Sequence, residues 1–362
     1  MSQKTTPPPG PSGPAADTTT TTTTAGTTAG TTAGPDTAGS SPITVPAHAQ
    51  SWVHRLADPS FWADWAALIG LVVLAIVFEI GNSSFLDVGN IQAMLVASSI
   101  LIVLSLGQTF VIATGGIDLS IAAAMTFGAV CFGSAFGHGQ PIWLCCVIAV
   151  AGSAAVGVVN GLLVGVAGIT DFIVTLGTLS AASGAALVVA NGQPTTIVDR
   201  FLLRMSTDGI GIIGWPVVVA ALLAVVAHVV LFHTRFGTHV LAAGGSKEAA
   251  TATGISVGRI KVAVYSISGT LAGVGAILLV ARIGASEPAA NTSFLLNSVA
   301  AVVLGGVSLF GGRATIIGPV LGALLLTALA NGLTLLGVSE FYQPIAVGAV
   351  VVLAALITRF QK

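Results

Sequence analysis

The stretch that most closely resembles a chemical motif is Gly244-Gly245-Ser246-Lys247. A phosphate-binding loop needs the pattern G-x-x-x-x-G-K-[ST], and this stretch lacks both that spacing and a hydroxyl residue after the lysine. No nucleophile, base and acid stand together at a spacing typical of an active site. The cysteines are Cys131, Cys145 and Cys146, and all lie in apolar runs without metal-site spacing. The sequence therefore predicts no catalysis, no directly bound nucleotide or other cofactor, and no metal site.

Ionisable groups within the apolar runs are scarce. The acids in or beside these runs are Glu79, Asp118 and Asp171, and two histidines follow at His228 and His233. Proton-driven carriers usually keep acids or histidines near the middle of the membrane, where such groups are expensive. The sequence shows no relay of this kind, which counts against a proton pump or a proton-driven carrier. Directed movement of a solute would then need a partner that supplies the energy, and a passive channel is the alternative.

The composition sets the fold class. Of 362 residues, 54% are hydrophobic, 7% are charged and 45 are glycine, whereas a soluble domain is about a quarter charged. Repeated apolar runs of roughly 20 residues match the length of a transmembrane helix, and a β-barrel would show shorter alternating segments instead. We therefore expect an all-α, polytopic transmembrane bundle. The net charge of -1 argues against a nucleic-acid partner.

The apolar runs predict about ten helices with glycine-rich breaks. The expected segments are residues 63–80, two segments within 91–137, and then 142–165, 172–190, 210–232, 260–280, 295–309, 315–336 and 342–357. The pair within 91–137 separates at residues 114–118, where two glycines followed by an acid would interrupt a helix. Glycines at four-residue spacing, such as Gly157, Gly161 and Gly165, predict closely packed helix faces, within one subunit or between subunits.

Two regions of different composition follow. Residues 1–55 are rich in Thr, Pro, Gly and Ala, so we expect a disordered tail, and residues 60–360 form the transmembrane domain. Lys and Arg are retained on the cytoplasmic side of membrane proteins. Ten crossings put nine of the Lys and Arg residues on one side and three on the other. This sorting predicts cytoplasmic termini in a multi-pass protein of the bacterial cytoplasmic membrane.

The longest polar interval inside the apolar body is residues 233–261, and it falls on the cytoplasmic side of this topology. Its bases are Arg235, Lys247, Arg259 and Lys261, and its acid is Glu248. Ser246 is a suitable helix N-cap, the following KEAATAT favours a short helix, and Gly254 favours its end. A short helix outside the membrane is a natural docking element for a partner protein.

Several long blocks resemble one family. They are residues 107–120 (GQTFVIATGGIDLS), 160–165, 171–178, 191–194, 235–255, 300–313 (AAVVLGGVSLFGGR) and 330–338. In this order, across about residues 65–358, they resemble the permease subunits of ribose-type ATP-binding-cassette importers. The resemblance implies import of a monosaccharide or sugar alcohol by a homodimer or paired permease. It also implies a cytoplasmic ATPase that uses ATP and Mg, and an extracytoplasmic solute-binding protein.

The resemblance assigns a coupling role to part of the cytoplasmic loop at 234–259. The residues that would contact the ATPase are Gly244, Gly245, Ser246, Lys247, Glu248, Ala249, Ala250 and Gly254. A stand-alone secondary carrier or channel for a small polar solute is the alternative function. The long tail has no clear counterpart in this family.

Candidate solute-pathway residues supply hydroxyl, amide, carboxylate and open backbone groups, which match the hydroxyls of a sugar. They are Gln108, Thr109, Thr114, Gly115, Gly116, Asp118, Ser120, Asn160 and Thr175. The alternative is that these groups satisfy buried helix breaks. The chain also departs from the family, because residues 294–298 (FLLNS) stand where acids are common.

Overall fold

The computed structural model describes residues 59–289 and 292–359. The chain divides into two units, residues 1–49 and 50–362, and all described residues lie in the second. The tail predicted over residues 1–55 lies outside the described residues.

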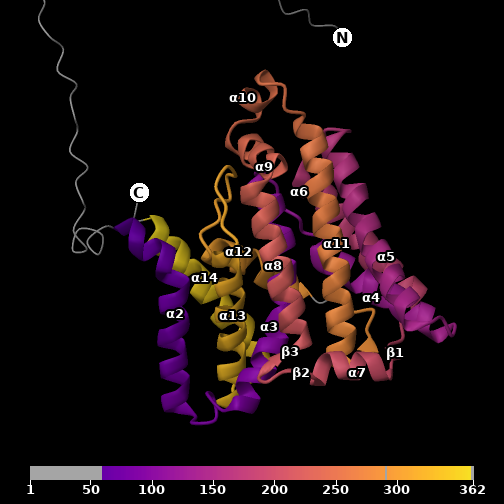
Figure 1. The fold of residues 1–362 in the computed structure, drawn as a ribbon, viewed down its shortest axis with the longest axis vertical. Helices are drawn as coiled ribbons and strands as arrows, with labels where there is room; N and C mark the ends of the chain where they lie inside the picture. Colours follow the sequence, from indigo (N-terminus) through magenta and orange to yellow (C-terminus); the bar gives the residue numbers. More distant parts are fainter. Residues whose placement is uncertain (1–58, 290–291, 360–362) are drawn as a thin grey trace, which may run out of the picture. The chain divides into compact units, whose positions relative to one another are not determined.

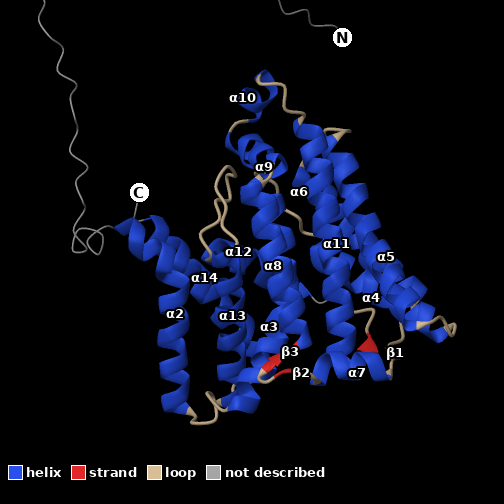
Figure 2. Ribbon diagram, viewed as in Figure 1, coloured by secondary structure: helices blue, strands red, loops and turns tan. Residues whose placement is uncertain are grey.

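The described chain is almost entirely helical (Figures 1 and 2). The helices are α2 (Pro59–Gly81), α3 (Val88–Ala113), α4 (Ile121–Gly137), α5 (Ile142–Gly165), α6 (Asp171–Val189), α7 (Arg200–Thr207), α8 (Trp215–His233), α9 (Arg235–Gly245), α10 (Lys247–Ala252), α11 (Val257–Ile283), α12 (Thr292–Leu304), α13 (Ile317–Leu335) and α14 (Gln343–Arg359), with a 3₁₀ turn, η1, at Glu340–Tyr342. Two antiparallel pairs of short strands complete it: β1 (Thr195–Thr196) with β4 (Ala285–Ser286), and β2 (Gly209–Ile210) with β3 (Ile213–Gly214). The all-α prediction is confirmed.

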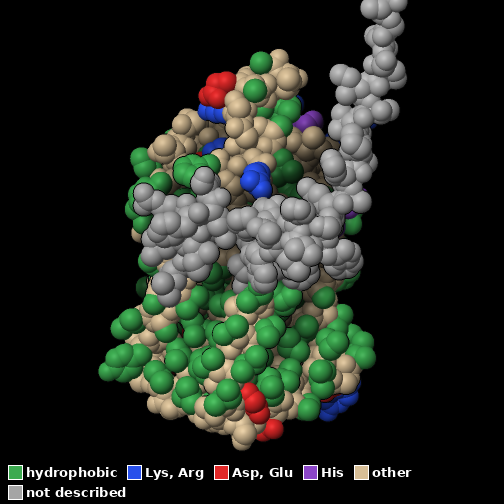
Figure 3. All heavy atoms as spheres, turned by 90° about the vertical axis from the view of Figure 1, so that its left-hand side faces the viewer, with side chains coloured by type: hydrophobic (Ala, Val, Ile, Leu, Met, Phe, Trp, Pro, Cys, Tyr) green, Lys and Arg blue, Asp and Glu red, His purple; other side chains and the backbone are tan. Residues whose placement is uncertain are grey.

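Each predicted crossing has a corresponding helix. They are α2, α3, α4, α5, α6, α8, α11, α12, α13 and α14. Among the described residues, six helices are long and apolar enough to cross a membrane, and three shorter apolar helices accompany them. On the face that carries α2, hydrophobic side chains cover much of the described surface, and charged side chains lie toward its two ends (Figure 3). This is the pattern expected of a chain that crosses a bilayer.

The polar segment at residues 191–209, which was expected to be a connector, is partly helical. α7 is a short surface helix capped by Asp199, whose Oδ1 accepts a 2.7 Å hydrogen bond from the N–H of Phe201. It lies with the strands at one end of the bundle, and α9 and α10 lie at the other (Figure 1). We call these the α7 end and the α10 end. The segment predicted to start the helix at residue 210 instead forms the β2–β3 hairpin, because Gly211 takes a left-handed φ of 63°.

The tightest helix packing joins α5 to α11. A methyl group on Gly161 would lie 2.7 Å from the Cα of Val262, and one on Gly157 would lie 2.9 Å from the Cα of Gly269. Small residues allow such close backbone approach where hydrophobicity does not drive helix association. The predicted glycine face therefore packs inside one chain. α11 also packs on α3, whose residues from Ser98 to Ala113 are all buried.

We predict that Gly161→Ala lowers the thermal stability of the purified protein, because the new methyl group must push α5 away from α11. The expected loss is about 2 kcal/mol, the usual size of an overpacking penalty. Thermal unfolding followed by size-exclusion chromatography in detergent would measure it. Gly177→Ala on α6 is the matched control, since a methyl group there meets nothing within 4 Å. Equal unfolding temperatures for the two variants would contradict the prediction.

Candidate functional site: the α10 end and the helix break

α10 is an exposed, well-capped helix. Ser246 Oγ accepts a 3.2 Å hydrogen bond from the N–H of Ala249 and donates one of 3.2 Å to Glu248 Oε2. The helix ends where Gly254 takes a φ of 85° and its N–H donates to Thr251 O at 3.0 Å. The short helix predicted from Ser246 to Gly254 is therefore confirmed. Within α10 only Ala250 is buried, so the rest of the helix is open to a partner.

α9 packs beside α10, and this helix was not expected from the sequence. Thr234 caps α9 by accepting a 3.3 Å hydrogen bond from the N–H of Gly237. The helix buries Val240 and Ala243 against its neighbours α8, α11 and α3. Three glycines within its eleven residues hid this helix, because glycine is a poor helix former. α9 and α10 together form a compact projection at the α10 end.

The C-terminal end of α9 meets two other segments backbone to backbone. A methyl group on Gly244 would clash with Ala113 O and would lie 2.7 Å from the N of Gly312. The N–H of Gly312 itself donates to Ala113 O at 3.1 Å. Gly311, with a φ of 81°, approaches the N of Gly115 just as closely, because a methyl group there would lie 2.7 Å from it. We call residues 113–115, 244–245 and 311–312 the glycine junction. It brings the end of the projection into direct contact with the helix break.

The break between α3 and α4 is held by a buried polar network. Asp118 Oδ1 accepts hydrogen bonds from the N–H and Oγ of Ser120 at 2.9 and 2.7 Å. Asp118 Oδ2 accepts one from Ser268 Oγ at 2.8 Å, and Asn160 Nδ2 donates to Ser120 Oγ at 2.7 Å. All four side chains are at most 2% exposed. The network therefore fixes the break to α5 and α11.

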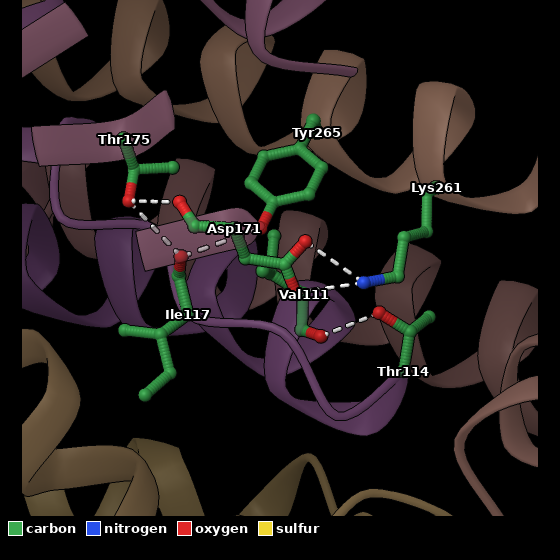
Figure 4. Close-up of polar contacts among 7 residues, drawn as sticks. All are labelled: Val111, Thr114, Ile117, Asp171, Thr175, Lys261 and Tyr265. Carbon is green, nitrogen blue, oxygen red and sulfur yellow. Dashed lines mark hydrogen bonds and ion pairs between the residues drawn. The ribbon is translucent and has the colours of Figure 1, made fainter. Parts of the chain in front are cut away.

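An ion pair lies on the other side of the break (Figure 4). Lys261 Nζ contacts both carboxylate oxygens of Asp171, at 2.8 and 2.7 Å, and the two side chains are only 20% and 16% exposed. Tyr265 Oη donates to Ile117 O at 3.3 Å, and Thr175 Oγ1 lies 3.3 Å from the same oxygen. The N-terminal halves of α6 and α11 are thus joined to each other and to the break.

Gly116 makes this close arrangement possible. A methyl group there would lie 2.9 Å from Asp171 Oδ2 and 3.0 Å from Tyr265 Oη. The backbone of the break passes directly beside the ion pair for this reason. Tyr265 and Lys261 were missed as members of the site, because their partners are 90 or more residues away in the sequence.

Two other predicted pathway residues form hydrogen bonds to backbone oxygens of α3. Thr109 Oγ1 donates to Ser105 O and Thr114 Oγ1 donates to Val111 O, each at 2.7 Å. Gln108 differs, because it is fully buried and neither its Nε2 nor its Oε1 has a hydrogen-bond partner among the described residues. Asn160 Oδ1 is likewise buried without a partner among them. The break thus satisfies most of its own polar groups, and its role in a solute pathway stays a prediction.

The arrangement links a surface helix to buried helix ends. Movement of α9–α10 would act directly on the backbone of residues 113–115. Through the break it would also act on the N-terminal halves of α4, α6 and α11. Closely packed backbones transmit displacement well, because no flexible side chain lies between them. This geometry suits a protein that receives a mechanical signal at the α10 end.

Comparison with known proteins gives the family. Residues 90–357 match the family described as the permease component of a branched-chain amino acid transport system. The chain belongs to this family of transport permeases. It is a multi-pass membrane protein and a transport subunit. The match begins in the first turn of α3 and ends in α14, so it includes the whole break, the glycine junction and the α9–α10 projection.

The curated relatives carry names that differ from the family description. The chain is 38% identical to the ribose import permease of Bacillus subtilis over 80% of this chain and 91% of that protein. It is 35% identical to the ribose import permease of Escherichia coli K12, covering 80% of this chain and 92% of that protein. The D-allose transport permease of the same strain is 30% identical, covering 83% and 92%. No solved structure matches the chain at the level required of a significant similarity.

We predict that Lys261→Met destabilises the protein by about 2 kcal/mol, because it leaves the mostly buried Asp171 carboxylate without a cation. A fully buried pair would lose more, and the remaining exposure reduces the effect. Adding Asp171→Leu should recover much of the lost thermal stability, since no uncompensated charge is then left.

Arg259→Met is the control for Lys261→Met. Arg259 is an exposed cation two residues away on the same helix, so its removal should leave the unfolding temperature unchanged. A double variant that is no more stable than Lys261→Met alone would show that the ion pair does not account for the loss.

Proposed function

We propose that this protein is the membrane permease of a binding-protein-dependent ATP-binding-cassette importer that carries a monosaccharide or sugar alcohol. Family membership and the names of the sugar-permease relatives support this. The observation that carries the proposal is the exposed, capped α10 and its backbone contact, through the glycine junction, with the helix break. The sugar permeases among the relatives decide for a sugar over the amino acid in the family description.

A partner ATPase supplies the energy in this proposal. ATP and Mg bind to that partner, and the permease binds no cofactor itself. The ATPase contacts the exposed residues of the predicted set, which are residues 245–249 and Gly254, whereas Gly244 and Ala250 pack against the bundle. α10 presents a base and an acid, Lys247 and Glu248, on its exposed face. Closure of the ATPase pair on ATP would push this helix and shift the equilibrium between two conformations of the bundle. The size of that shift is set by the difference between the two conformations in affinity for the ATPase.

The remaining partners follow from the same assignment. An extracytoplasmic binding protein delivers the solute at the α7 end, and a second permease copy or a similar subunit completes the transporter. In this proposal the α10 end faces the cytoplasm, and both termini lie in the same compartment, because the excess of Lys and Arg is predicted on that side. Gly115, Gly116, Asp118, Ser120 and Thr175 then form the cytoplasmic part of the pathway, where the break changes shape as the bundle switches state.

We predict that Lys247→Ala combined with Glu248→Ala reduces ATP-driven uptake at least tenfold, because it removes both charges by which α10 engages the ATPase. Uptake and co-purification would be measured after co-expression with the cognate ATPase and binding protein. Lys247→Arg with Glu248→Asp is the matched control, since it changes the same two side chains but keeps both charges on α10. Normal assembly and uptake in the double-alanine variant would contradict the coupling role.

We also predict that proteoliposomes containing only this protein show no sugar uptake, and that uptake begins when ATPase, ATP and binding protein are added. The physical reason is the scarcity of ionisable groups that could couple transport to an ion gradient. Radiolabelled sugar and flux measurements with and without ATP would test this. Flux through the permease alone would favour the stand-alone carrier or channel.

A further inference from the structure

A cavity of about 350 Å³ opens at the α7 end, away from the helix break. It is formed by the first half of α3, the start of α12, the second half of α13 and the last turn of α11. Its lining residues are Ala93, Met94, Ala97, Leu101, Arg282, Phe294, Asn297, Leu326, Thr327, Ala330, Asn331 and Thr334. Small-molecule pockets begin at about 300 Å³, so the cavity has room for one monosaccharide.

The polar groups of the cavity suit a polyhydroxylated solute. Arg282 and Asn297 have no hydrogen bond or ion pair to any described residue, so both are available to a ligand. Thr327, Asn331 and Thr334 follow each other along one face of α13. Hydroxyl and amide groups both donate and accept hydrogen bonds, as sugar hydroxyls do, and Phe294 adds an aromatic surface. None of the described residues that line the cavity is an acid.

The depth of the polar lining argues against a lipid headgroup. From Thr327 to Thr334, the polar face of α13 extends over about 10 Å of helix. A lipid site would confine its polar groups to the rim and leave an apolar slot for the acyl chains. Here the polar lining extends to Thr327, farther from the α7 end than Asn331 and Thr334, and the innermost lining residue of α3 is Leu101, which is 4% exposed.

Beyond the inner end of the cavity, α3 carries a buried amide. Met94, Ala97 and Leu101 line the cavity from one face of α3, and Gln108 follows on that face at the i+7 position. Gln108 is about 10 Å deeper than Leu101. Its amide is fully buried and unpartnered among the described residues, an arrangement that normally costs stability. The same stripe of α3 therefore leads from the cavity, past Leu101, to a free polar group.

We propose that this cavity is the extracytoplasmic solute site of the permease, with Arg282 and Asn297 contacting the sugar and Gln108 receiving it once Leu101 moves aside. The assignment rests on the proposed function, since a sugar must first reach this end. The solute leaves the cavity toward the helix break. Displacement of the break by α9–α10 opens the path at the α10 end.

Cysteine protection tests occupancy directly. Asn297→Cys would be placed in the full-length protein with Cys131, Cys145 and Cys146 replaced by Ser, and labelled from outside with a membrane-impermeant maleimide. D-ribose, L-arabinose and D-allose are the probes, with anionic lipid vesicles as a further arm. We expect at least one sugar to slow labelling at Asn297→Cys and to leave the control, exposed Ser293→Cys, unchanged. Protection by lipid but by no sugar would overturn the proposal.

Transport tests the role of Gln108 and Asn297. Asn297→Ala should raise the half-saturating sugar concentration of the complete importer roughly tenfold, the effect of one lost polar contact. Gln108→Leu should lower the uptake rate while leaving the unfolding temperature equal or higher, because an unpartnered amide is replaced by an apolar group of similar size. A purely structural Gln108 would leave uptake unchanged.

Different results would contradict the proposed function and the cavity assignment. If the wild-type importer takes up no member of a panel of monosaccharides and sugar alcohols that includes these three sugars, the proposed function is wrong. If it takes up a sugar but Asn297→Ala and Gln108→Leu match the Ser293→Ala control in uptake, the cavity assignment is wrong.

Discussion

A helix break inside an apolar bundle leaves backbone polar groups without helical partners, and the need to give them hydrogen bonds determines much of this structure. Backbone polar groups freed within a membrane must find partners in the protein, because no water or lipid group replaces them at low cost. Here Thr175 and Tyr265, from α6 and α11, contact the backbone oxygen of Ile117. Asn160 and Ser268, from α5 and α11, bond the side chains of Ser120 and Asp118 in the same break. The break is consequently a point where several helices meet and depend on one another.

Glycine residues allow a surface helix to approach the helix break closely. At the glycine junction, the ends of α3 and α9 and the loop after α12 approach at backbone distance, which no larger residue would permit. A surface helix and a buried break are thereby adjacent, although more than 100 residues separate them in the chain. A force applied to α10 acts on backbone rather than on flexible side chains. This is the physical basis for assigning coupling to this end.

The two ends of the molecule have different chemistry. The α10 end is rich in polar contacts that are already made, so its groups hold structure and change their arrangement only when the bundle moves. The α7 end has a cavity whose guanidinium and amide, Arg282 and Asn297, form no hydrogen bond or ion pair with any described residue. Buried polar groups that lack partners are uncommon in folded proteins, which makes Gln108 on the path between the two ends a notable exception.

The sequence alone determined the all-α class, the positions of the crossings, the break at residues 114–118 and the capped helix from Ser246 to Gly254. These depend on local properties: the length of apolar runs, and the conformational preferences of Gly and of capping residues. Tertiary structure decided which groups meet. Lys261 was expected only as a loop cation, and its pairing with Asp171 depends on α6 and α11 lying side by side. The glycine junction and the cavity likewise join distant segments, and a single sequence carries no local signal of such proximity.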